Sequence, residues 1–479
     1  MTQKYKQLVF EDYNLAINNS TCDYKAEGLA SRLKNVECKN ASIKSACMLG
    51  DLFEVLAPNR VESAKQVFTN TIGACKWISG YQFFKNNKQV EYAVFCNLEN
   101  KIFYYEIGAS NPDFKCLTNV VFSSTPTIDF FIKDGHNIML LSSPTDSMYV
   151  WDGLTEPYQV LDAPKIDSMA VGLERLFVST TTHPYSVLFS DDMDPSNWCM
   201  AADEAGEIVF NDNLGTVLKV CALDNYIYVV RDYGILKLYG YKESENTFNV
   251  SRVYASTSKI FKNSIAIAGD RLVFMANDGI YSFDGLSAKR INNKLYGLVF
   301  NPDLCRAACK DGIYYLCLNL YENCEKNNAL ICLDLETKNI TNICYGFDFQ
   351  NLCILSANNA LEMVVISSDI VSKNANTPQY ICKNRNKNDK NAQFEYLTHF
   401  LNLQPHSHNK MLCKLTFLCK TDIKICVETD TQIKEFFVNA SDKFQTIKLN
   451  LKANIFAIKF YGIGDVDISH IKLDYCFVE

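Results

Sequence analysis

A single phrase recurs along the first three quarters of this chain and restricts its fold more than any other feature. In each copy a polar turn precedes four or five residues that alternate between apolar and polar, and a second turn leads to a short strand ending at an acidic residue or a glycine. Such a unit is typical of a β-hairpin. Five copies and a looser sixth lie at residues 92–108, 136–153, 174–191, 225–240, 270–285 and 311–337.

The hairpins recur every 40 to 50 residues or so, which is roughly the length of one four-stranded propeller blade. Weaker strand patterns between them would supply the inner strands. A helical bundle and a doubly wound α/β fold are disfavoured, because the chain has no long recurring stretch with a 3.6-residue period. Aromatic residues make up 12% of the chain, as expected of an all-β protein. The sequence predicts an all-β fold in which residues 1–371 form a β-propeller of six or seven blades with an N-terminal lead-in strand, closed by pairing between early and late strands.

The composition changes at residues 372–393, where asparagine and lysine replace the apolar alternation. This segment is expected to be a linker or an exposed loop. Six alternating segments follow in under eighty residues. Their spacing predicts a separate C-terminal β-sandwich domain at residues 394–479.

Charge and cysteine usage limit the classes of function. The formal net charge is −7, so no basic footprint favours sequence-specific DNA binding. The N-terminal residues lack an apolar signal region, and no apolar run approaches the roughly 18 residues of a membrane span, so we expect no membrane anchor. The 20 cysteines are scattered singly, and we expect most of them to be small buried side chains of a protein made in a reducing cytoplasm. Because no C-x-x-C pair occurs, we expect no structural zinc. We expect no other cofactor.

An acidic corner follows the third hairpin, in the phrase SDDMDPSNW. Asp191, Asp192 and Asp194 lie within a few residues of Trp198. We expect a structural turn in which the aspartates accept backbone N–H groups and the tryptophan packs on the next strand. The phrase is similar to the Asp-box of sialidase-like propellers, itself a turn staple, although Asp194 and Pro195 stand where glycine would help and the phrase is one residue longer. Calcium is the alternative, since carboxylates are hard ligands, but the glycine and terminal glutamate of an EF-hand loop are missing.

Other candidate sites are weaker. His399, His406 and His408 border the segment rich in asparagine and lysine, where solvated histidines are more common than metal ligands. The chain has no G-x-S-x-G, P-loop or H-E-x-x-H motif. A glycosidase would need two carboxylates facing each other across a pocket, which a sequence alone does not place. We therefore expect no enzymatic activity.

Residues 175–240, with RLFVSTTTHPYSVLFSDDMDPSNW followed by GEIVFNDNLGTVLKVCALDNYIYVVRDYGILKLYG, resemble a phrase common in virion proteins of tailed phages. The stretch EGLASRLKNVECKNASIKSA at residues 27–46 is similar to the opening of the same proteins. They include the β-propeller tail-neck and nozzle components of short-tailed phages, sometimes called packaged-DNA stabilisation proteins. The resemblance covers about residues 27–340 and departs at residues 38–48, where cysteines, serine and lysine replace a glycine-containing pattern.

The resemblance implies a non-enzymatic phage structural protein, a head-to-tail connector or tail nozzle component in the virion tail or neck, synthesised in the bacterial host cytoplasm. It would form a homo-oligomeric ring of six or twelve copies with the portal, adaptor or other tail proteins, through which DNA passes without sequence-specific binding. The negative net charge suits such a channel, because carboxylates repel phosphate. The alternative is a carbohydrate-binding or glycoside-hydrolysing β-propeller, with Trp151 and Trp198 stacking on sugar rings.

Overall fold

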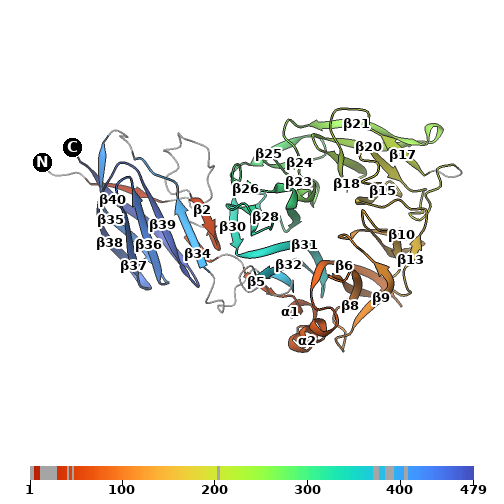
Figure 1. Ribbon diagram of the computed structural model, residues 1–479, viewed down its shortest axis with the longest axis horizontal. Coiled ribbons are helices and arrows are strands. Elements are labelled where there is room, and N and C mark those ends of the chain that lie inside the picture. Colours follow the sequence, from red (N-terminus) through yellow and green to blue (C-terminus); the bar gives the residue numbers. More distant parts are fainter. Residues whose placement is uncertain are drawn as a thin grey trace.

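The computed structural model describes residues 5–10, 30–39, 42–45, 48–201, 205–369, 377–382, 393–403 and 408–478. It has two parts along its long axis, a ring of small sheets and a C-terminal body of two larger sheets (Figure 1). Helices are short in the described residues: α1 (Phe53–Leu56), α2 (Val61–Thr71) and the 3-10 turns η1 (Glu243–Glu245), η2 (Lys262–Ser264) and η3 (Pro302–Leu304). None of these helices has the length and apolarity to cross a membrane. The all-β prediction is confirmed.

Most of the ring consists of four-stranded antiparallel sheets whose strands are consecutive in the sequence. The first five sheets are β6 (Cys75–Lys85), β7 (Lys88–Asn97), β8 (Lys101–Glu106) and β9 (Phe114–Val121); β10 (Thr127–Lys133), β11 (His136–Ser142), β12 (Met148–Trp151) and β13 (Tyr158–Val160); β14 (Ser168–Gly172), β15 (Arg175–Ser179), β16 (Ser186–Phe189) and β17 (Gly206–Val209); β18 (Val217–Leu223), β19 (Tyr226–Arg231), β20 (Gly234–Lys242) and β21 (Thr247–Ala255); and β22 (Ala266–Ala268), β23 (Arg271–Ala276), β24 (Gly279–Phe283) and β25 (Ala288–Asn292).

Two further sets of strands complete the ring. They are β26 (Val299–Phe300), β27 (Arg306–Lys310), β28 (Ile313–Leu320), β29 (Ala329–Asp334) and β30 (Ile340–Tyr345), and then β31 (Phe347–Ala357), β32 (Ala360–Asp369), β33 (Thr377–Cys382) and β5 (Met48–Asp51). In the last sheet the early strand β5 pairs with the late strand β33, Gln379 opposite Asp51. The predicted pairing between early and late strands is therefore present.

The five predicted hairpins and the looser sixth form the two middle strands of their sheets, as in the antiparallel pair β15 and β16. The structure differs from the sequence expectation at the segment 372–393. Within it, β33 is a strand hydrogen-bonded to β32 and β5, so the segment is not a linker or loop throughout. Its backbone groups are satisfied by a partner from the other end of the chain.

Neighbouring sheets of the ring are joined through apolar clusters and through polar bonds between their first strands. Trp151 of β12 packs on Tyr81 of β6, with ring centroids 5.3 Å apart. Near the centre, the carboxylate of Asp129 in β10 accepts the backbone N–H of Val171 in β14 at 2.8 Å. Burial raises the pKa of Asp129 to about 6, against the opposing effect of its backbone hydrogen bonds. The sheets thus form a propeller-like ring (Figure 1).

The C-terminal body contains all six segments predicted to be strands after residue 393. Its strands are β34 (Gln393–Thr398), β35 (Asn409–Cys419), β36 (Ile423–Thr429), β37 (Ile433–Val438), β38 (Ser441–Ala453), β39 (Phe456–Ile463) and β40 (Asp467–Val478), together with the N-terminal strands β1 (Lys6–Val9), β2 (Ala30–Lys34), β3 (Val36–Lys39) and β4 (Ser42–Ser45). One sheet has the order β2-β34-β39-β36-β37, and the other contains β3-β4-β40-β35-β38. Side chains of both sheets share one apolar core, which continues into the ring through side chains such as Leu316 and Ile331.

The N-terminal strands lie in a different place from that expected of a lead-in to the propeller. β1 and β4 pair with β40, and β2 pairs with β34, so these residues belong to the C-terminal body. Burial accounts for this arrangement, because Leu33, Val36 and Ile43 are fully buried in the core of the body. β3 also pairs with β30 of the ring, Val36 opposite Ile343, which makes one continuous sheet of the two parts.

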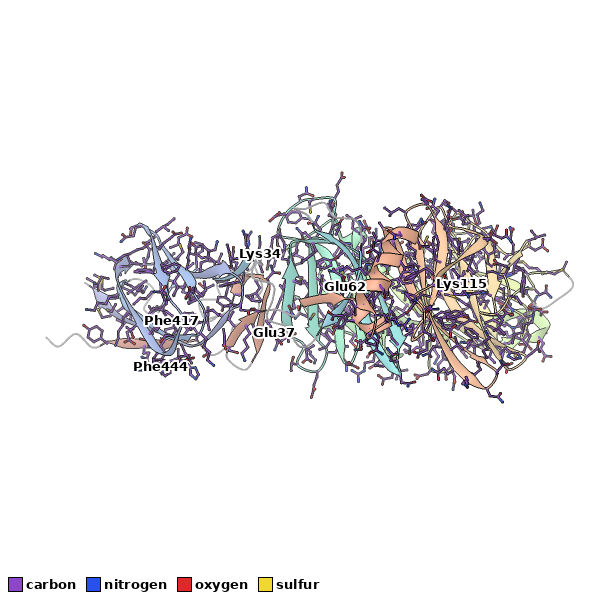
Figure 2. All side chains as sticks on the ribbon, turned by 90° about the horizontal axis from the view of Figure 1, so that it is seen from below. Lys34, Glu37, Glu62, Lys115, Phe417 and Phe444 are labelled. Atoms are coloured by element: carbon purple, nitrogen blue, oxygen red, sulfur yellow. The ribbon has the colours of Figure 1, made fainter. Side chains whose placement is uncertain are left out.

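The junction between the two parts carries further contacts. The ammonium of Lys34 lies 4.1 Å from the ring centroid of Tyr345 and 3.5 Å from the carboxylate of Glu322. The side-chain oxygen of Asn35 accepts the backbone N–H of Tyr345 at 2.6 Å. In the side view of Figure 2, Lys34 and Glu37 lie between the C-terminal body and the ring. The N-terminal segment therefore joins the two parts.

Most cysteines of the described residues are buried. Cys96 in β7 is an example, where burial raises the pKa of the thiol to about 11. Such thiols behave as small apolar side chains in their sheets.

Candidate functional site

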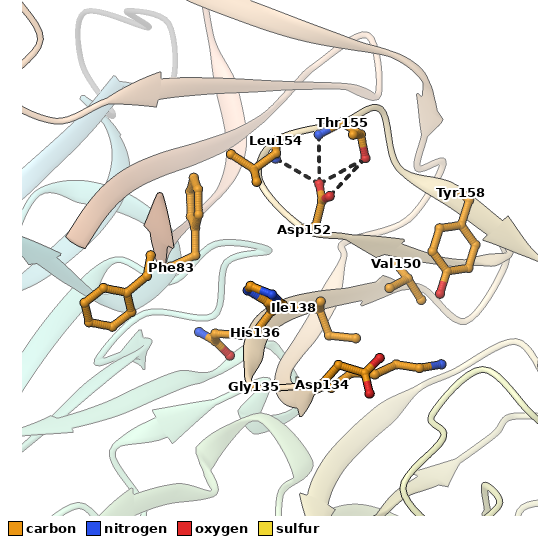
Figure 3. Close-up of a pocket in the computed structure, with 13 residues that line it drawn as sticks. Phe83, Asp134, Gly135, His136, Ile138, Val150, Asp152, Leu154, Thr155 and Tyr158 are labelled. Carbon is orange, nitrogen blue, oxygen red and sulfur yellow. Dashed lines mark hydrogen bonds between the residues drawn. The ribbon is translucent and has the colours of Figure 1, made fainter. Parts of the chain in front are cut away.

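A cavity of about 310 Å³ opens on the ring between the sheets that begin with β6 and β10 (Figure 3). Its walls come from the end of β6, the turn between β10 and β11, and the connection between β12 and β13. Phe84, Leu154 and Tyr158 are more than half exposed at this site. The lining residues are Phe83, Phe84, Lys133, Asp134, Gly135, His136, Asn137, Ile138, Val150, Asp152, Leu154, Thr155 and Tyr158.

One carboxylate of the cavity, that of Asp152, is already occupied by local hydrogen bonds. Its Oδ1 atom accepts the backbone N–H groups of Leu154 and Thr155, each at 2.8 Å, as the dashed lines in Figure 3 show. Burial acts to raise the pKa of Asp152, but these bonds outweigh it and hold the pKa below its usual value. Asp152 is thus an ionised turn residue.

A glycine shapes the wall beside Asp152. Gly153 has φ of +78°, and a Cβ atom added there would lie 2.6 Å from the ring of Phe83. The turn needs the left-handed backbone conformation, and the aromatic ring needs the space of the missing side chain. The sequence thereby fixes both the turn and the position of the Phe83 ring.

The acidic corner lies in the connection between β16 and β17, and two of its aspartates hold the turn. Oδ2 of Asp191 accepts the side-chain N–H of Asn197 at 3.0 Å, and the backbone N–H of Asp191 donates to the Asn197 carbonyl at 3.0 Å. Oδ1 of Asp194 accepts the backbone N–H of Ser196, also at 3.0 Å. Met193 between them has φ of +53°. These contacts are those of a closed turn.

The other two residues predicted at the corner behave differently from each other. The carboxylate of Asp192 is exposed and makes no hydrogen bond within the part of the chain that the structure describes. Trp198 is 7% exposed and packs in the apolar cluster between the second and third sheets of the ring. The corner therefore depends on Asp191, Asp194 and Trp198 more than on Asp192.

The acidic corner and the cavity are neighbours. Lys133, which lines the cavity, donates to Oδ1 of Asp194 at 2.8 Å. Burial lowers the pKa of the Lys133 ammonium, but the bond to Asp194 outweighs this and the pKa is raised. The hydroxyl groups of Tyr158 and Ser196 lie 3.2 Å apart. The sequence predicted the acidic corner but not the cavity. The walls of the cavity come from two different sheets, whose packing no local pattern indicates.

The described residues contain no group of three or more His, Cys, Asp or Glu side chains placed to hold a metal ion. At the acidic corner the carboxylates turn to separate partners, Asp191 to Asn197 and Asp194 to Lys133. Of the three histidines considered from the sequence, His406 lies outside the described residues.

The two tryptophans proposed to stack on sugars are buried. Trp151 is 1% exposed, and its indole N–H donates to the carbonyl of Thr155 at 2.9 Å. Trp198 is also buried. A sugar ring has no access to either face, so any carbohydrate site in this region would use Phe84 and Tyr158 instead.

Comparisons with known proteins give similarity in three dimensions only. No protein-family model matches the chain, and no curated protein matches it. The solved structures that are similar include BBS1N in complex with ARL6DN, at 10% identity and a TM-score of 0.42, covering 65% of this chain and 94% of that one. Another is PorZ, a surface component of the type-IX secretion system of Porphyromonas gingivalis, at 10% identity and a TM-score of 0.37, covering 72% of this chain and 44% of that one. Neither similarity indicates a function for this chain.

Proposed function

We propose that this chain is a seven-bladed β-propeller with a C-terminal β-sandwich, and that it is a non-enzymatic structural protein of a tailed-phage virion. Seven sets of four strands support the blade number, since β27–β30 form a set like the six separate four-stranded sheets. The common core of the two sheets of the C-terminal body supports the sandwich. In this proposal the protein is part of the head-to-tail connector or the tail nozzle.

The observation that carries the proposal is the pairing of β3 with β30. A β-ladder joins the ring to the C-terminal body, whereas a flexible linker would let them move independently. The contacts of Lys34 and Asn35 with Tyr345 reinforce this junction. A rigid, elongated subunit of this kind suits a cyclic assembly that must keep a channel open while DNA slides through without sequence-specific contacts.

The cavity favours a second candidate, a carbohydrate-binding or glycoside-hydrolysing propeller. Exposed Phe84 and Tyr158 beside Asp134 and Asp152 form a recess of the kind that binds small ligands. Hydrolysis would need one carboxyl group with a raised pKa as a general acid. Asp152 has the opposite property, because its hydrogen bonds lower the pKa. Binding without hydrolysis is the form of this candidate that the site supports better.

The test is to look for the protein in purified phage particles by mass spectrometry and to locate it by electron microscopy. The proposal expects a ring of six or twelve copies beside the portal, adaptor or other tail proteins. In parallel, the free protein is incubated with a panel of glycans. Absence from particles, or glycan hydrolysis with measurable turnover that Asp134→Asn abolishes, would replace the virion role with the carbohydrate role.

A further inference from the structure

The sheet β38-β35-β40 of the C-terminal body has one face on the core and leaves the other in solvent. Across β38 and β35, Lys448 lies opposite Lys414, and Lys452 lies opposite Met411. Residues directly opposite in an antiparallel pair share a face. Lys472 of β40 belongs to the same face, because it pairs with Thr416. We name this surface the basic sheet face, defined by Lys414, Lys448, Lys452, Lys472 and Phe444.

The charge of the basic sheet face is only partly neutralised. Lys414 forms an ion pair with Asp474, with the nitrogen and oxygen 3.0 Å apart. Lys448, Lys452 and Lys472 have no carboxylate within 4 Å in the described residues. Phe444 of β38, 62% exposed, adds an apolar side chain whose ring centroid lies 5.8 Å from that of His470 in β40. A positive surface with an aromatic anchor therefore occurs on a chain whose net charge is −7.

The ring carries the opposite charge on one of its two faces. In a four-stranded antiparallel sheet, the turn between the first two strands and the connection between the last two lie at the same end. Contacts join these connections in neighbouring sheets, as from Lys133 to Asp194 and from Asn246 to the Ala205 carbonyl. We name this surface the acidic ring face. Its described carboxylates are Asp113, Asp134, Asp152, Glu156, Glu174, Asp191, Asp192, Asp194, Asp224, Glu243, Glu245, Asp270, Asp284, Asp311 and Glu336.

Cations offset only part of this charge. Within the described connections the one cation is Lys338. Some lysines at strand ends pair with the carboxylates, such as Lys310 with Asp311 at 3.3 Å. Glu174, Asp192 and Asp224 have no ion-pair partner in the described part of the chain. The acidic ring face therefore keeps a net negative charge.

We infer that the basic sheet face of one copy docks on the acidic ring face of a second copy. The two surfaces have opposite charge and lie on different parts of the chain, so the contact joins unlike surfaces and can close into a ring. This inference rests on the proposed function for the biological setting of the ring, but not for the contact itself. The lysines would also attract a nucleic acid, yet the larger acidic charge of the same molecule repels polyanions.

The test is a charge swap at exposed positions. One variant carries Lys448→Glu and Lys452→Glu, a second carries Asp192→Lys and Asp224→Lys, and a third carries all four changes. We expect wild-type self-association, measured by sedimentation velocity, to weaken by about tenfold or more when the salt concentration rises from about 50 to about 500 mM. Each double variant should lose the association, and the fourfold variant should regain it.

Matched controls change the same charges elsewhere. Lys115→Glu lies on the outer strand β9, and Glu325→Lys lies in the connection between β28 and β29. Both residues are exposed, and both variants should associate like the wild type. Circular dichroism checks that each variant is folded. Equal weakening by the controls would show a general charge effect and would overturn the inference.

A second measurement tests whether the basic sheet face binds nucleic acid instead of a second copy. Together with the analysis of particles, it also distinguishes failure of the docking from failure of the virion role. Binding of a random-sequence DNA duplex is followed by fluorescence anisotropy, and we expect little binding by the wild type. If Lys448→Glu with Lys452→Glu abolishes strong duplex binding and leaves self-association unchanged, the basic sheet face binds nucleic acid and the inference is wrong. If the protein occurs in purified particles but is monomeric at every salt concentration, the docking fails while the virion role stands. If the protein shows salt-dependent self-association but is absent from purified particles, the docking stands and the virion role fails.

Discussion

In the ring, strands that follow one another in the sequence pair with one another, as β15 pairs with β16 after a short connection. In the C-terminal body, partners come from opposite ends of the chain, as where the Ser31 hydroxyl donates to the carbonyl of Thr398, 367 residues later. Both parts are built of antiparallel strands, which are buried along almost their whole length in the middle of the ring sheets, as in β15, and at alternate positions in the C-terminal body, as in β36. The contrast shows that similar strands can be assembled from local or from distant segments, and that only the local route leaves a readable period in the sequence.

Removing the N-terminal segment should have the largest effect, and it should affect the C-terminal body more than the ring. A variant without residues 1–45 lacks β1 to β4, which supply Leu33, Val36 and Ile43 to the core of the C-terminal body. We expect residues 393–478 to become sensitive to limited proteolysis, while the ring, which keeps β5, stays resistant. Mass spectrometry of the fragments measures this. Equal sensitivity of the two parts would show that the ring also depends on the N-terminal segment.

Substitutions of two fully buried residues, one in each part, should have a smaller effect. Ile43→Ala in the C-terminal body and Leu140→Ala in the ring should each lower the free energy of unfolding by about 2 to 5 kcal/mol. Hydrogen exchange should then separate them. Ile43→Ala is expected to accelerate exchange in β35 and β40, far away in the sequence, and Leu140→Ala only in adjacent sheets of the ring. Identical exchange patterns would contradict the difference between local and distant assembly.

The ring should also carry a pH dependence that comes from one buried carboxylate. Burial raises the pKa of Asp129 from 3.8 to about 6 in the folded state, so the folded protein binds the proton more tightly than the unfolded chain. This contribution to stability is complete below pH 4 or so and is lost as the pH rises through 6, a change of about 3 kcal/mol. Denaturant unfolding between pH 4 and pH 7 measures it.

Two variants control this measurement. Asp129→Asn keeps the size of the side chain but cannot titrate, and should flatten the dependence between pH 4 and pH 7. Asp134→Asn, at the exposed turn of the same sheet, should leave it unchanged. An unchanged profile in the Asp129 variant would assign the pH dependence to another group.

The smallest expected effect distinguishes two neighbouring aspartates in the ring. Asp191→Ala removes the acceptor for Asn197 and should lower the free energy of unfolding by about 1 to 2 kcal/mol. Asp192→Ala removes an exposed carboxylate and should change it by less than about 0.5 kcal/mol. Thermal unfolding of the two variants measures the difference. A larger loss at Asp192, or calcium binding that this substitution abolishes, would restore the metal alternative at the corner.

The sequence predicted the hairpins of the ring because each one contains its own turn and its own alternation. It assigned no hairpin to β31 and β32, although Asn358 and Asn359 between them have φ of +54° and +63°, conformations for which asparagine is a known signal. β33 is six residues long and lies among asparagines and lysines, so its composition resembles a loop. Nothing local in β2 or β3 indicates a partner hundreds of residues away.

The candidate site shows the same limit. The acidic corner could be predicted as a turn, since its aspartates and asparagine act within a few residues of each other. Its contact with Lys133 could not, because that residue belongs to the preceding sheet. The cavity depends on Phe83 and Gly153, whose proximity follows only from the packing of two sheets.

The pairing of β5 with β33, and of β2 with β34, has a consequence for how the protein is made. β2 and β5 leave the ribosome long before they can find their partners, because those partners are synthesised only after the rest of the ring. Five ring sheets, from β6–β9 to β22–β25, can form as soon as they are synthesised, but ring closure must wait for β33 and the C-terminal body for the strands from β34 to β40. Throughout that interval the N-terminal strands carry unpaired edges, which makes the nascent chain a natural client for chaperones.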